Sequence, residues 1–153
     1  MNIRKLTAAD LPAVKLILAD TGLFPPEMLE DIVGPFLQGN EHEHRWLVCE
    51  TAADGVVGFS YTRAEELADS VWNLLAIGFC SEFQGRRFGT ELIAEVERSL
   101  KGERMLIVET SSLDDFDSTR DFYRSRGYDQ EAVIRGYWAD GDDKIIFRKL
   151  LGL

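Results

Sequence analysis

The stretch from Trp72 to Leu100 most strongly constrains what this chain can fold into. An apolar run over residues 71–79 predicts a buried strand, and a polar, glycine-bearing turn follows it. The first N–H groups of a helix lack intrahelical partners and lie at the positive end of the helix dipole. A strand, a turn and a helix start in this order therefore predict an anion-binding site. After the turn, apolar residues recur at helical spacing: Phe88, Leu92, Ile93, Val96 and Leu100.

Hydrophobic periodicity and turn signals divide the rest of the chain into alternating strands and helices. Strand 105–108 follows a strand and a helix, so we expect it to lie parallel to strand 71–79. The order predicts a single α/β domain over residues 1–153 with a mixed sheet. Its strands are expected at 2–6, 46–50, 55–61, 71–79, 105–108, 129–138 and 144–150, and its helices after Thr7, after Pro25, and at 88–100 and 117–126.

Composition narrows the functional classes. No apolar run approaches the roughly 20 residues that span a bilayer, and the basic start lacks the apolar segment of a signal peptide. We therefore expect a cytoplasmic protein without a membrane partner. The net charge of −10 argues against nucleic acid and weakly favours a cationic partner. An anionic cofactor would need a local basic island, which Arg86 and Arg87 provide.

Cysteine and histidine give no metal-site signature. Cys49 and Cys80 are too few and too far apart for a disulfide framework, and small buried hydrophobes are the expected reading of both. Cys80 lies at the mouth of the predicted site, so a reactive role is the less favoured alternative. His42 and His44 alternate with acids, yet no further ligands lie near them, and we expect a flexible surface loop without metal.

The turn after strand 71–79 resembles the acetyl-CoA-binding signature of the GNAT family of N-acetyltransferases. That signature is Gln/Arg-x-x-Gly-x-Gly/Ala, and here it reads Gln84-Gly85-Arg86-Arg87-Phe88-Gly89. Three further patterns follow the family order: the Thr-x-x-Asp helix start after Ile3-Arg4, the sequence Phe122-Tyr123-x-x-x-Gly127-Tyr128, and the final hairpin around residues 142–147. The resemblance thus covers nearly the whole chain.

The resemblance implies a GNAT-like fold with a central, mostly antiparallel sheet, one splayed parallel strand pair and flanking helices. It implies direct transfer of the acetyl group of acetyl-CoA to a primary amine of a small molecule or peptide. Dimers are common among similar proteins, so a homodimer is compatible with it. Carried over residue by residue, it assigns the cofactor to Ile77, Phe79, Gln84, Gly85, Arg86, Arg87, Phe88, Gly89 and Thr90.

Arg87 departs from the signature, which has glycine at this position. Glycine permits close approach of the backbone to a phosphate, whereas a side chain takes room. If residue 87 has right-handed helical dihedral angles, arginine costs little strain there. We expect a tolerated substitution in which Arg86 and Arg87 act as additional phosphate ligands.

The resemblance also supplies candidates for proton transfer. Tyr123 matches a tyrosine that, in the family, stands near the sulfur of the cosubstrate and acts as general acid or stabilises the thiolate. The alternative interpretation is that Tyr123 is an aromatic residue of the core. Glu109 lies at the end of a strand, at the expected cleft. Two interpretations of it are equally favoured: a general base and a structural carboxylate. Glu65 and Glu66 are weaker candidates for the base. Residues that would line an acceptor pocket, if they are not simply packed, are Phe24, Trp72 and Asn73.

Two non-enzymatic alternatives remain at this point. One is an acyl-CoA-binding module that keeps the fold without turnover, and the other is a protein-interaction domain that uses its acidic surface. The sequence contains no Gly-x-Gly-x-x-Gly or Gly-Lys-Ser/Thr turn, which excludes a Rossmann or P-loop nucleotide protein.

Overall fold

The computed structural model describes residues 1–152, and these residues form two compact units. Unit 1 comprises residues 1–64 and 75–100, and unit 2 comprises residues 65–74 and those from 101 onward. Strand β4 (Val71–Phe79) contributes its first four residues to unit 2 and the remainder to unit 1. No helix in the described part of the chain is long and apolar enough to cross a membrane.

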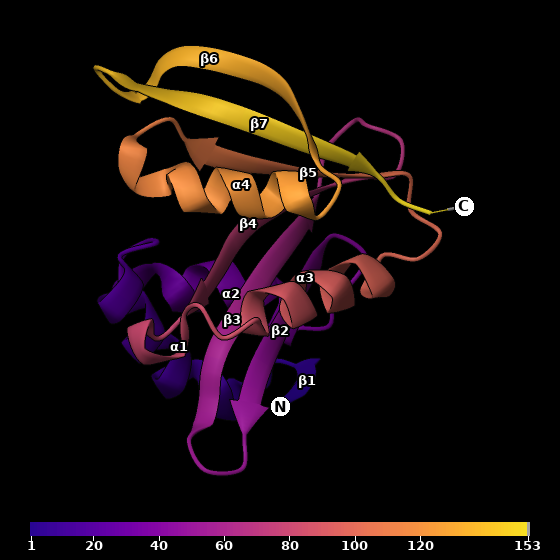
Figure 1. Ribbon diagram of the computed structural model, residues 1–153. Helices are drawn as coiled ribbons and strands as arrows, with labels where there is room; N and C mark the ends of the chain where they lie inside the picture. Colours follow the sequence, from indigo (N-terminus) through magenta and orange to yellow (C-terminus); the bar gives the residue numbers. More distant parts are fainter. Residues whose placement is uncertain (153) are drawn as a thin grey trace. The chain divides into compact units, whose positions relative to one another are not determined.

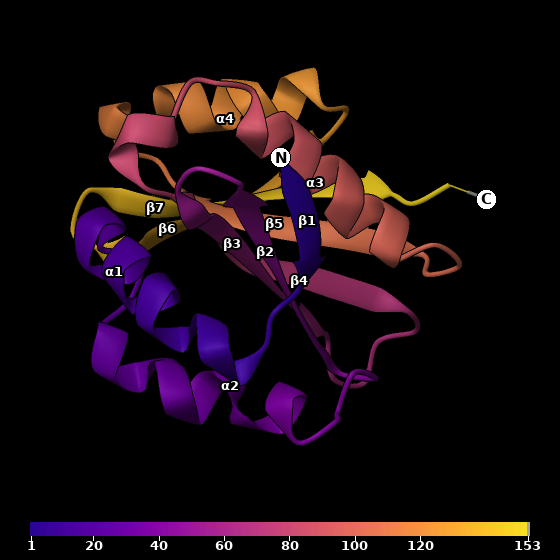
Figure 2. The ribbon, with the colours of Figure 1, turned by 90° about the horizontal axis from the view of Figure 1, so that it is seen from below.

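Unit 1 contains an antiparallel sheet with helices on both faces. Strand β1 (Asn2–Lys5) pairs with β2 (His44–Thr51), which pairs with β3 (Gly55–Ala64) as an antiparallel hairpin. Helices α1 (Leu11–Thr21) and α2 (Leu29–Leu37) cover one face of this sheet, and α3 (Phe88–Ser99) covers the other (Figure 2).

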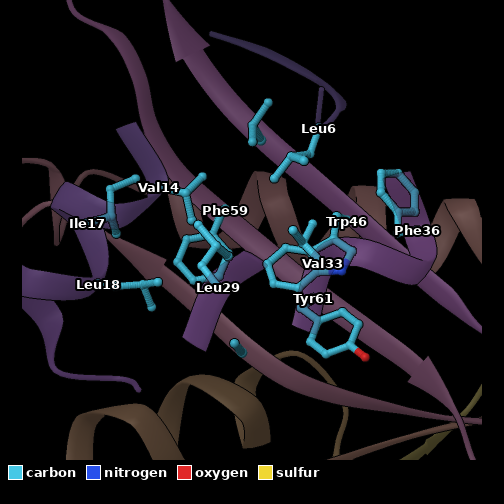
Figure 3. Packing of buried hydrophobic residues seen from close by; sticks show 12 residues of the cluster. Leu6, Val14, Ile17, Leu18, Leu29, Val33, Phe36, Trp46, Phe59 and Tyr61 are labelled. Carbon is cyan, nitrogen blue, oxygen red and sulfur yellow. The ribbon is translucent and has the colours of Figure 1, made fainter. Parts of the chain in front are cut away.

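The core of unit 1 follows from the period of two in β2 and β3. Alternate residues of a strand point to the same face, which brings Trp46 and Val48 of β2 toward α1 and α2. The indole of Trp46 stacks on Tyr61 of β3 at a centroid distance of 4.3 Å. Figure 3 shows the cluster, which comprises Leu6, Val14, Ile17, Leu18, Leu29, Val33, Phe36, Trp46, Val48, Phe59, Tyr61 and Ala76.

Unit 2 is an antiparallel ladder backed by one helix. Strand β5 (Met105–Ser111) pairs with β7 (Asp142–Leu150), and β7 pairs with β6 (Asp129–Ala139). Helix α4 (Asp117–Ser125) packs its buried Tyr123 against Phe147 of β7. Gly127 follows this helix with φ +89°, the left-handed conformation that ends helices.

The predicted mixed sheet is confirmed. Its strand order is β1-β2-β3-β4-β5-β7-β6 (Figure 1), and β4 with β5 is the parallel pair. In that pair Val71–Leu74 lie opposite Met105–Val108. The predicted order of strands and helices is reproduced along the whole described chain.

His44 is a correction to the expected surface loop. It is the first residue of β2, it is buried, and its Nδ1 is hydrogen-bonded to the hydroxyl of Tyr61 at 2.8 Å. Burial, together with the charge of Arg63, lowers the pKa of His44, which therefore stays neutral at pH 7. A buried histidine that bonds a tyrosine is a structural element of unit 1. Residues 1–152 contain no group of three His, Cys, Asp or Glu placed to hold a metal ion.

Arg4 joins the first strand to the start of α1. Its guanidinium binds both carboxylate oxygens of Asp10, at 2.8 and 2.9 Å, and it also donates to Glu50 of β2 at 3.0 Å. The backbone N–H of Thr7 donates to the same Asp10 carboxylate, as the predicted Thr-x-x-Asp capping box requires. The hydrogen bond from Arg4 is the main reason why the pKa of the nearly buried Asp10 lies below its usual value.

Replacement of Arg4 by Met is expected to lower the free energy of unfolding by about 2 kcal/mol at pH 7, because Asp10 keeps a buried charge without its partner. Asp10 has a depressed pKa in the folded state, so its stabilising effect is present above about pH 4 and is lost as the pH falls through the folded-state pKa. The difference between wild type and Arg4→Met should therefore shrink at low pH. Urea denaturation across pH measures both effects.

Lys5→Met is the matched control for this prediction. Lys5 is the next residue on β1, and its ion pair with Glu41 is well exposed. Such pairs contribute little, so its loss should change stability by less than about 1 kcal/mol. Equal destabilisation by the two substitutions would show that the Arg4 network has no special role.

Candidate functional site

The predicted anion site begins where β4 ends, within unit 1. Phe79 is the last residue of β4, and its ring lies directly over Gly58 of β3. A Cβ atom at position 58 would come within 2.4 Å of that ring, so only glycine leaves room for it. The N–H of Cys80 then donates to the carbonyl of Val57 at 3.0 Å, which ties the beginning of the turn to β3.

Aromatic contacts fix the turn against the start of α3. The ring of Phe88, the first residue of α3, lies 6.1 Å from that of Phe79 and 6.0 Å from that of Phe83. Phe83 is buried within the 3-10 turn Ser81–Phe83, and the guanidinium of Arg86 lies over its ring at 5.3 Å. The aromatic residues therefore hold the polar turn by packing.

Two side-chain hydrogen bonds hold the turn from either side. Gln84 Nε2 donates to the carbonyl of Phe79 at 3.1 Å, which closes the turn on itself. Asp20, near the end of α1, accepts the N–H of Ser81 at 2.7 Å. The side-chain amide of Gln84, a predicted cofactor residue, thus has a structural partner. Asp20 could not be identified from the sequence, because no motif connects the end of α1 to a turn about sixty residues later.

Arg87 has left-handed backbone angles, φ +67° and ψ +5°, which corrects the right-handed conformation that would have made arginine easy to place. A residue with a Cβ atom costs roughly 1–2 kcal/mol in this region. The signature glycine at this position is therefore explained by the backbone conformation itself. Gly85, two residues earlier, also has a positive φ of +76°.

The beginning of α3 has the properties of an anion site. Arg87 stands at its N-cap position, and no side chain within residues 1–152 caps the helix there. Phe88, Gly89 and Thr90 form the first turn, whose N–H groups have no intrahelical partners, and all three are half-buried. The exposed residues Arg86 and Arg87 add positive charge at the same point. The donors and charges present fit a phosphate group.

The chemistry-bearing residues of unit 2 lie on β5, β7 and α4. Glu109 of β5 forms an ion pair with Lys144 of β7 at 2.8 Å. The ammonium of Lys144 also lies 4.1 Å from the centre of the Tyr137 ring. Burial lowers the pKa of Lys144, but the hydrogen bond and charge of Glu109 outweigh it, and the net shift is upward. Lys144 was not among the residues predicted for the site. The signal that could have identified it is a lysine placed between Asp143 and the apolar part of the last strand.

Tyr123 lies in an aromatic cluster. Its side chain is 2% exposed, and its ring contacts those of Phe122, Tyr128 and Phe147 at 5.4 to 5.9 Å. Burial raises the pKa of the Tyr123 hydroxyl well above its ordinary value. The phenol therefore stays protonated at neutral pH, as a proton donor must, while its ring also serves as a core residue.

Glu109 and Tyr123 belong to opposite faces of the β5–β7 ladder. Glu109 is paired with Ile146, and Ser111 with Lys144, so these alternate residues share one face. Phe147, which contacts Tyr123, points to the other face, where α4 lies. The two candidates for proton transfer are thus separated by the ladder and do not contact each other.

The other candidates have mainly structural surroundings. Asn73 is buried, and its Nδ2 donates to Glu65 at 2.8 Å, while no partner within residues 1–152 reaches its Oδ1. Trp72 is buried, and Phe24 packs against the core of unit 1. Burial and nearby acids raise the pKa of Cys80, which disfavours a reactive thiolate. Burial likewise raises the pKa of Cys49 to about 12.

Arg87→Gly is expected to raise the free energy of unfolding by about 1 kcal/mol, because it relieves the left-handed strain. The same substitution should weaken acetyl-CoA binding if the Arg87 guanidinium contacts a phosphate group. Chemical denaturation and calorimetric titration measure the two effects separately.

Arg86→Gly is the matched control, since Arg86 does not have a positive φ. Glycine there adds unfolded-state entropy and removes the contact with Phe83, so this variant should lose stability. A loss of stability in both variants would contradict the assignment of strain to residue 87.

Comparison with known proteins agrees with this geometry. The family profile described as "Acetyltransferase (GNAT) family" matches residues 11–128. No curated protein matches the sequence significantly. Many solved structures share the fold.

Three of these structures show the range of the neighbours. A Desulfovibrio desulfuricans protein assigned to the GNAT acetyltransferases has 27% identity and a TM-score of 0.85, with 99% of each chain covered. The ribosomal-protein-S18-alanine N-acetyltransferase of Escherichia coli has 19% identity and a TM-score of 0.78, with 99% of this chain and 94% of that one covered. An aminoglycoside 6′-N-acetyltransferase in complex with coenzyme A has 16% identity and a TM-score of 0.79, with coverage of 100% and 98%. With the family profile over most of its length, this chain belongs to the GNAT family of acetyltransferases.

Proposed function

We propose that this protein transfers the acetyl group of acetyl-CoA directly to a primary amine of a small molecule or peptide. The observation that carries the proposal is the uncapped start of α3, where Arg86 and Arg87 are exposed beside a turn fixed by packing. Membership of the GNAT family agrees with acyl transfer, and a neighbour was solved with coenzyme A.

The residues that would hold the cosubstrate all belong to unit 1. Amides from Gly85 to Thr90, with the two arginines, would bind the pyrophosphate, and the backbone at Ile77 and Phe79 would pair with the pantetheine arm as an added strand does. Gln84 would act by holding the turn through the Phe79 carbonyl. Acetyl-CoA supplies the activated acetyl group and a thiolate leaving group.

Tyr123 is proposed as the proton donor to the departing thiolate. A thiol has an ordinary pKa of about 8.5, and burial raises the pKa of the tyrosine above its ordinary value of 10. The phenol therefore carries its proton throughout the neutral range and can stabilise a thiolate by hydrogen bonding.

Glu109 is proposed as the proton acceptor for the amine, acting through water. The Glu109 carboxylate is held by the Lys144 ammonium at 2.8 Å. The acceptor ammonium would compete with Lys144 for this carboxylate, so the pair would loosen when the acceptor binds.

The acceptor class is inferred from chemistry and from neighbours. One neighbour is named for acetylation of an alanine of a ribosomal protein, which is a protein acceptor. Another is named for aminoglycosides, which are small-molecule amines. A chain with net charge −10 attracts cationic amines of both kinds. A primary amine on a small molecule or peptide is the description that covers both.

Calorimetric titration with acetyl-CoA should give binding that Gly89→Glu abolishes, since the substitution places a negative charge in the first turn of α3. Thr90→Ser, which changes the same turn without charge, is the control and should retain affinity. Absence of binding by the folded wild type would contradict the proposed function.

Tyr123→Phe should lower kcat by about a hundredfold, the usual scale for a lost general acid, with little change in the KM for acetyl-CoA. Tyr128→Phe removes a hydroxyl from the same aromatic cluster and is the matched control, expected to retain turnover. Turnover is measured as the release of the coenzyme A thiol. The acceptors are a peptide with an N-terminal alanine, an aminoglycoside and a diamine.

Cofactor binding without turnover for any amine would favour the non-catalytic acyl-CoA-binding module instead. Equal loss in Tyr123→Phe and Tyr128→Phe would assign Tyr123 to the core alone.

A further inference from the structure

Three groups of unit 2 enclose the ammonium of Lys144. It forms the ion pair with Glu109 at 2.8 Å, and it lies 4.1 Å from the centre of the Tyr137 ring and 5.7 Å from that of Trp138. Both ring distances are within the range of about 6 Å over which cations are attracted to aromatic rings. The two rings are perpendicular, with their centres 4.7 Å apart. The Glu109 carboxylate and the two rings thus form a cage for one ammonium group.

An irregular part of β6 places the two rings. Between two paired positions of the β6–β7 hairpin, β6 has the residues 135–138, whereas β7 has only Asp143. Bulges of this kind turn side chains to new directions and are frequent beside active sites. The N–H of Gly136 donates to the Asp143 carboxylate at 2.8 Å, and the indole N–H of Trp138 donates to the carbonyl of Thr110 at 3.1 Å. The bulge is therefore held by bonds outside the cage.

The cage is open to solvent on the side of the rings. Tyr137 and Trp138 are 52% and 47% exposed, whereas Lys144 is 9% exposed. The rings can thus be reached from solvent, while the ammonium between them and Glu109 is covered. Aromatic cages of this kind recognise ammonium ligands.

A second carboxylate lies beside the Lys144 side chain. Asp142 is two positions before Lys144 on β7, so the two residues share a face. The Asp142 carboxylate accepts a hydrogen bond from Ser111, which is paired with Lys144. The flexible stem of a lysine allows its ammonium to move from Glu109 to Asp142. Exchange of the Lys144 ammonium for a ligand cation would then leave no charge without a partner.

The cage favours the charged form of an amine. Burial lowers the pKa of Lys144, but the hydrogen bond and charge of Glu109 outweigh it, and the pKa is raised. An amine must lose its proton before it attacks a thioester. The group that suits this cage is therefore a cation that stays charged, and not the amine that reacts.

We propose that Glu109, Tyr137 and Trp138 form a subsite for a second ammonium group of the acceptor, carried on an unbranched alkyl chain, and that Lys144 occupies this subsite in the free protein. The Lys144 side chain is itself an ammonium on an unbranched chain, so it gives the size and shape of the group that fits. The acceptor class is then a diamine or a similar dication, held by its non-reacting end. The acceptor part of this inference rests on the proposed function, whereas the ammonium subsite does not.

Chemical rescue of Lys144→Ala tests the subsite without acetyl-CoA. The substitution removes the side chain beyond Cβ, and n-propylammonium chloride supplies a cation of the size and charge that is lost. Binding is followed by tryptophan fluorescence, since Trp138 is exposed while Trp46 and Trp72 are buried. Lys144→Ala should bind n-propylammonium at least about tenfold more tightly than wild type, because the internal competitor is absent.

Three controls define the specificity of this binding. Isopropylammonium, the branched isomer with the same charge, should bind Lys144→Ala more weakly. Lys149→Ala removes another ammonium of β7, which lies 5.3 Å from the centre of the Tyr128 ring, and should bind n-propylammonium no better than wild type. Addition of Glu109→Gln to Lys144→Ala should abolish the gain.

Far-ultraviolet circular dichroism checks that each variant is folded. Lys144→Thr, a residue type that strands favour, takes the place of Lys144→Ala if that variant does not fold.

Turnover with acetyl-CoA tests the acceptor part. Wild type should have a lower KM for the diamine putrescine than for n-butylamine, which has the same chain with one amine. Tyr137→Leu removes one wall of the cage and should raise the KM for putrescine severalfold, which narrows that difference.

The outcomes separate the two parts of the inference. If Lys144→Ala binds n-propylammonium no better than wild type, the subsite is overturned, whatever the turnover. Binding without a preference for putrescine over n-butylamine would overturn the acceptor assignment and leave acetyl transfer intact. Absence of turnover with every amine would contradict the proposed function, and with it the acceptor assignment, while n-propylammonium binding alone decides the subsite.

Discussion

The free amide groups at the beginning of α3 are the constraint on which the candidate site depends. A helix that is left without a side-chain cap has N–H groups that must find water or a ligand. Such a helix start can bind a ligand well only if the turn before it is rigid. Here the stack of Phe79, Phe83 and Phe88 and the hydrogen bond from Gln84 supply that rigidity. The site is thus a product of packing, while its ligand-facing groups are mostly backbone.

Charge is distributed so that the same chain can attract both partners of the proposed reaction. The net charge of −10 favours a cationic acceptor over long range, whereas a polyanionic cosubstrate would be repelled. The adjacent Arg86 and Arg87 reverse this locally, at the point where the helix dipole is also positive. On unit 2 the arrangement is inverted, because the candidate base Glu109 is held beside the Lys144 ammonium.

Much of the fold could be predicted because its signals are local. The turn signals that divide the strands and the apolar spacing of α3 each act over a few residues, and both predicted their elements correctly. The candidate anion site could be predicted for the same reason, since strand, turn and helix start are contiguous.

The features that could not be predicted from the sequence are contacts between distant residues and backbone angles. His44 looked like part of a polar loop because its partner, Tyr61, lies seventeen positions away on another strand. The left-handed angle of Arg87 could not be read from a side chain that normally avoids it. The pairing of Glu109 with Lys144 likewise depends on the β5–β7 register, which sequence spacing does not determine.

The hydrogen bond from Ser81 to Asp20 has a thermodynamic consequence. It makes the last turn of α1 part of the free energy that orders the turn before α3. The contact of Leu23 with Gly78 joins the segment after α1 to the same strand end. Coupling is reciprocal, so whatever free energy an ordered α1–α2 connection adds to ligand binding at this turn, ligand binding adds to the order of that connection. Occupancy at the helix start is therefore coupled to the ordering of a segment far away in the sequence.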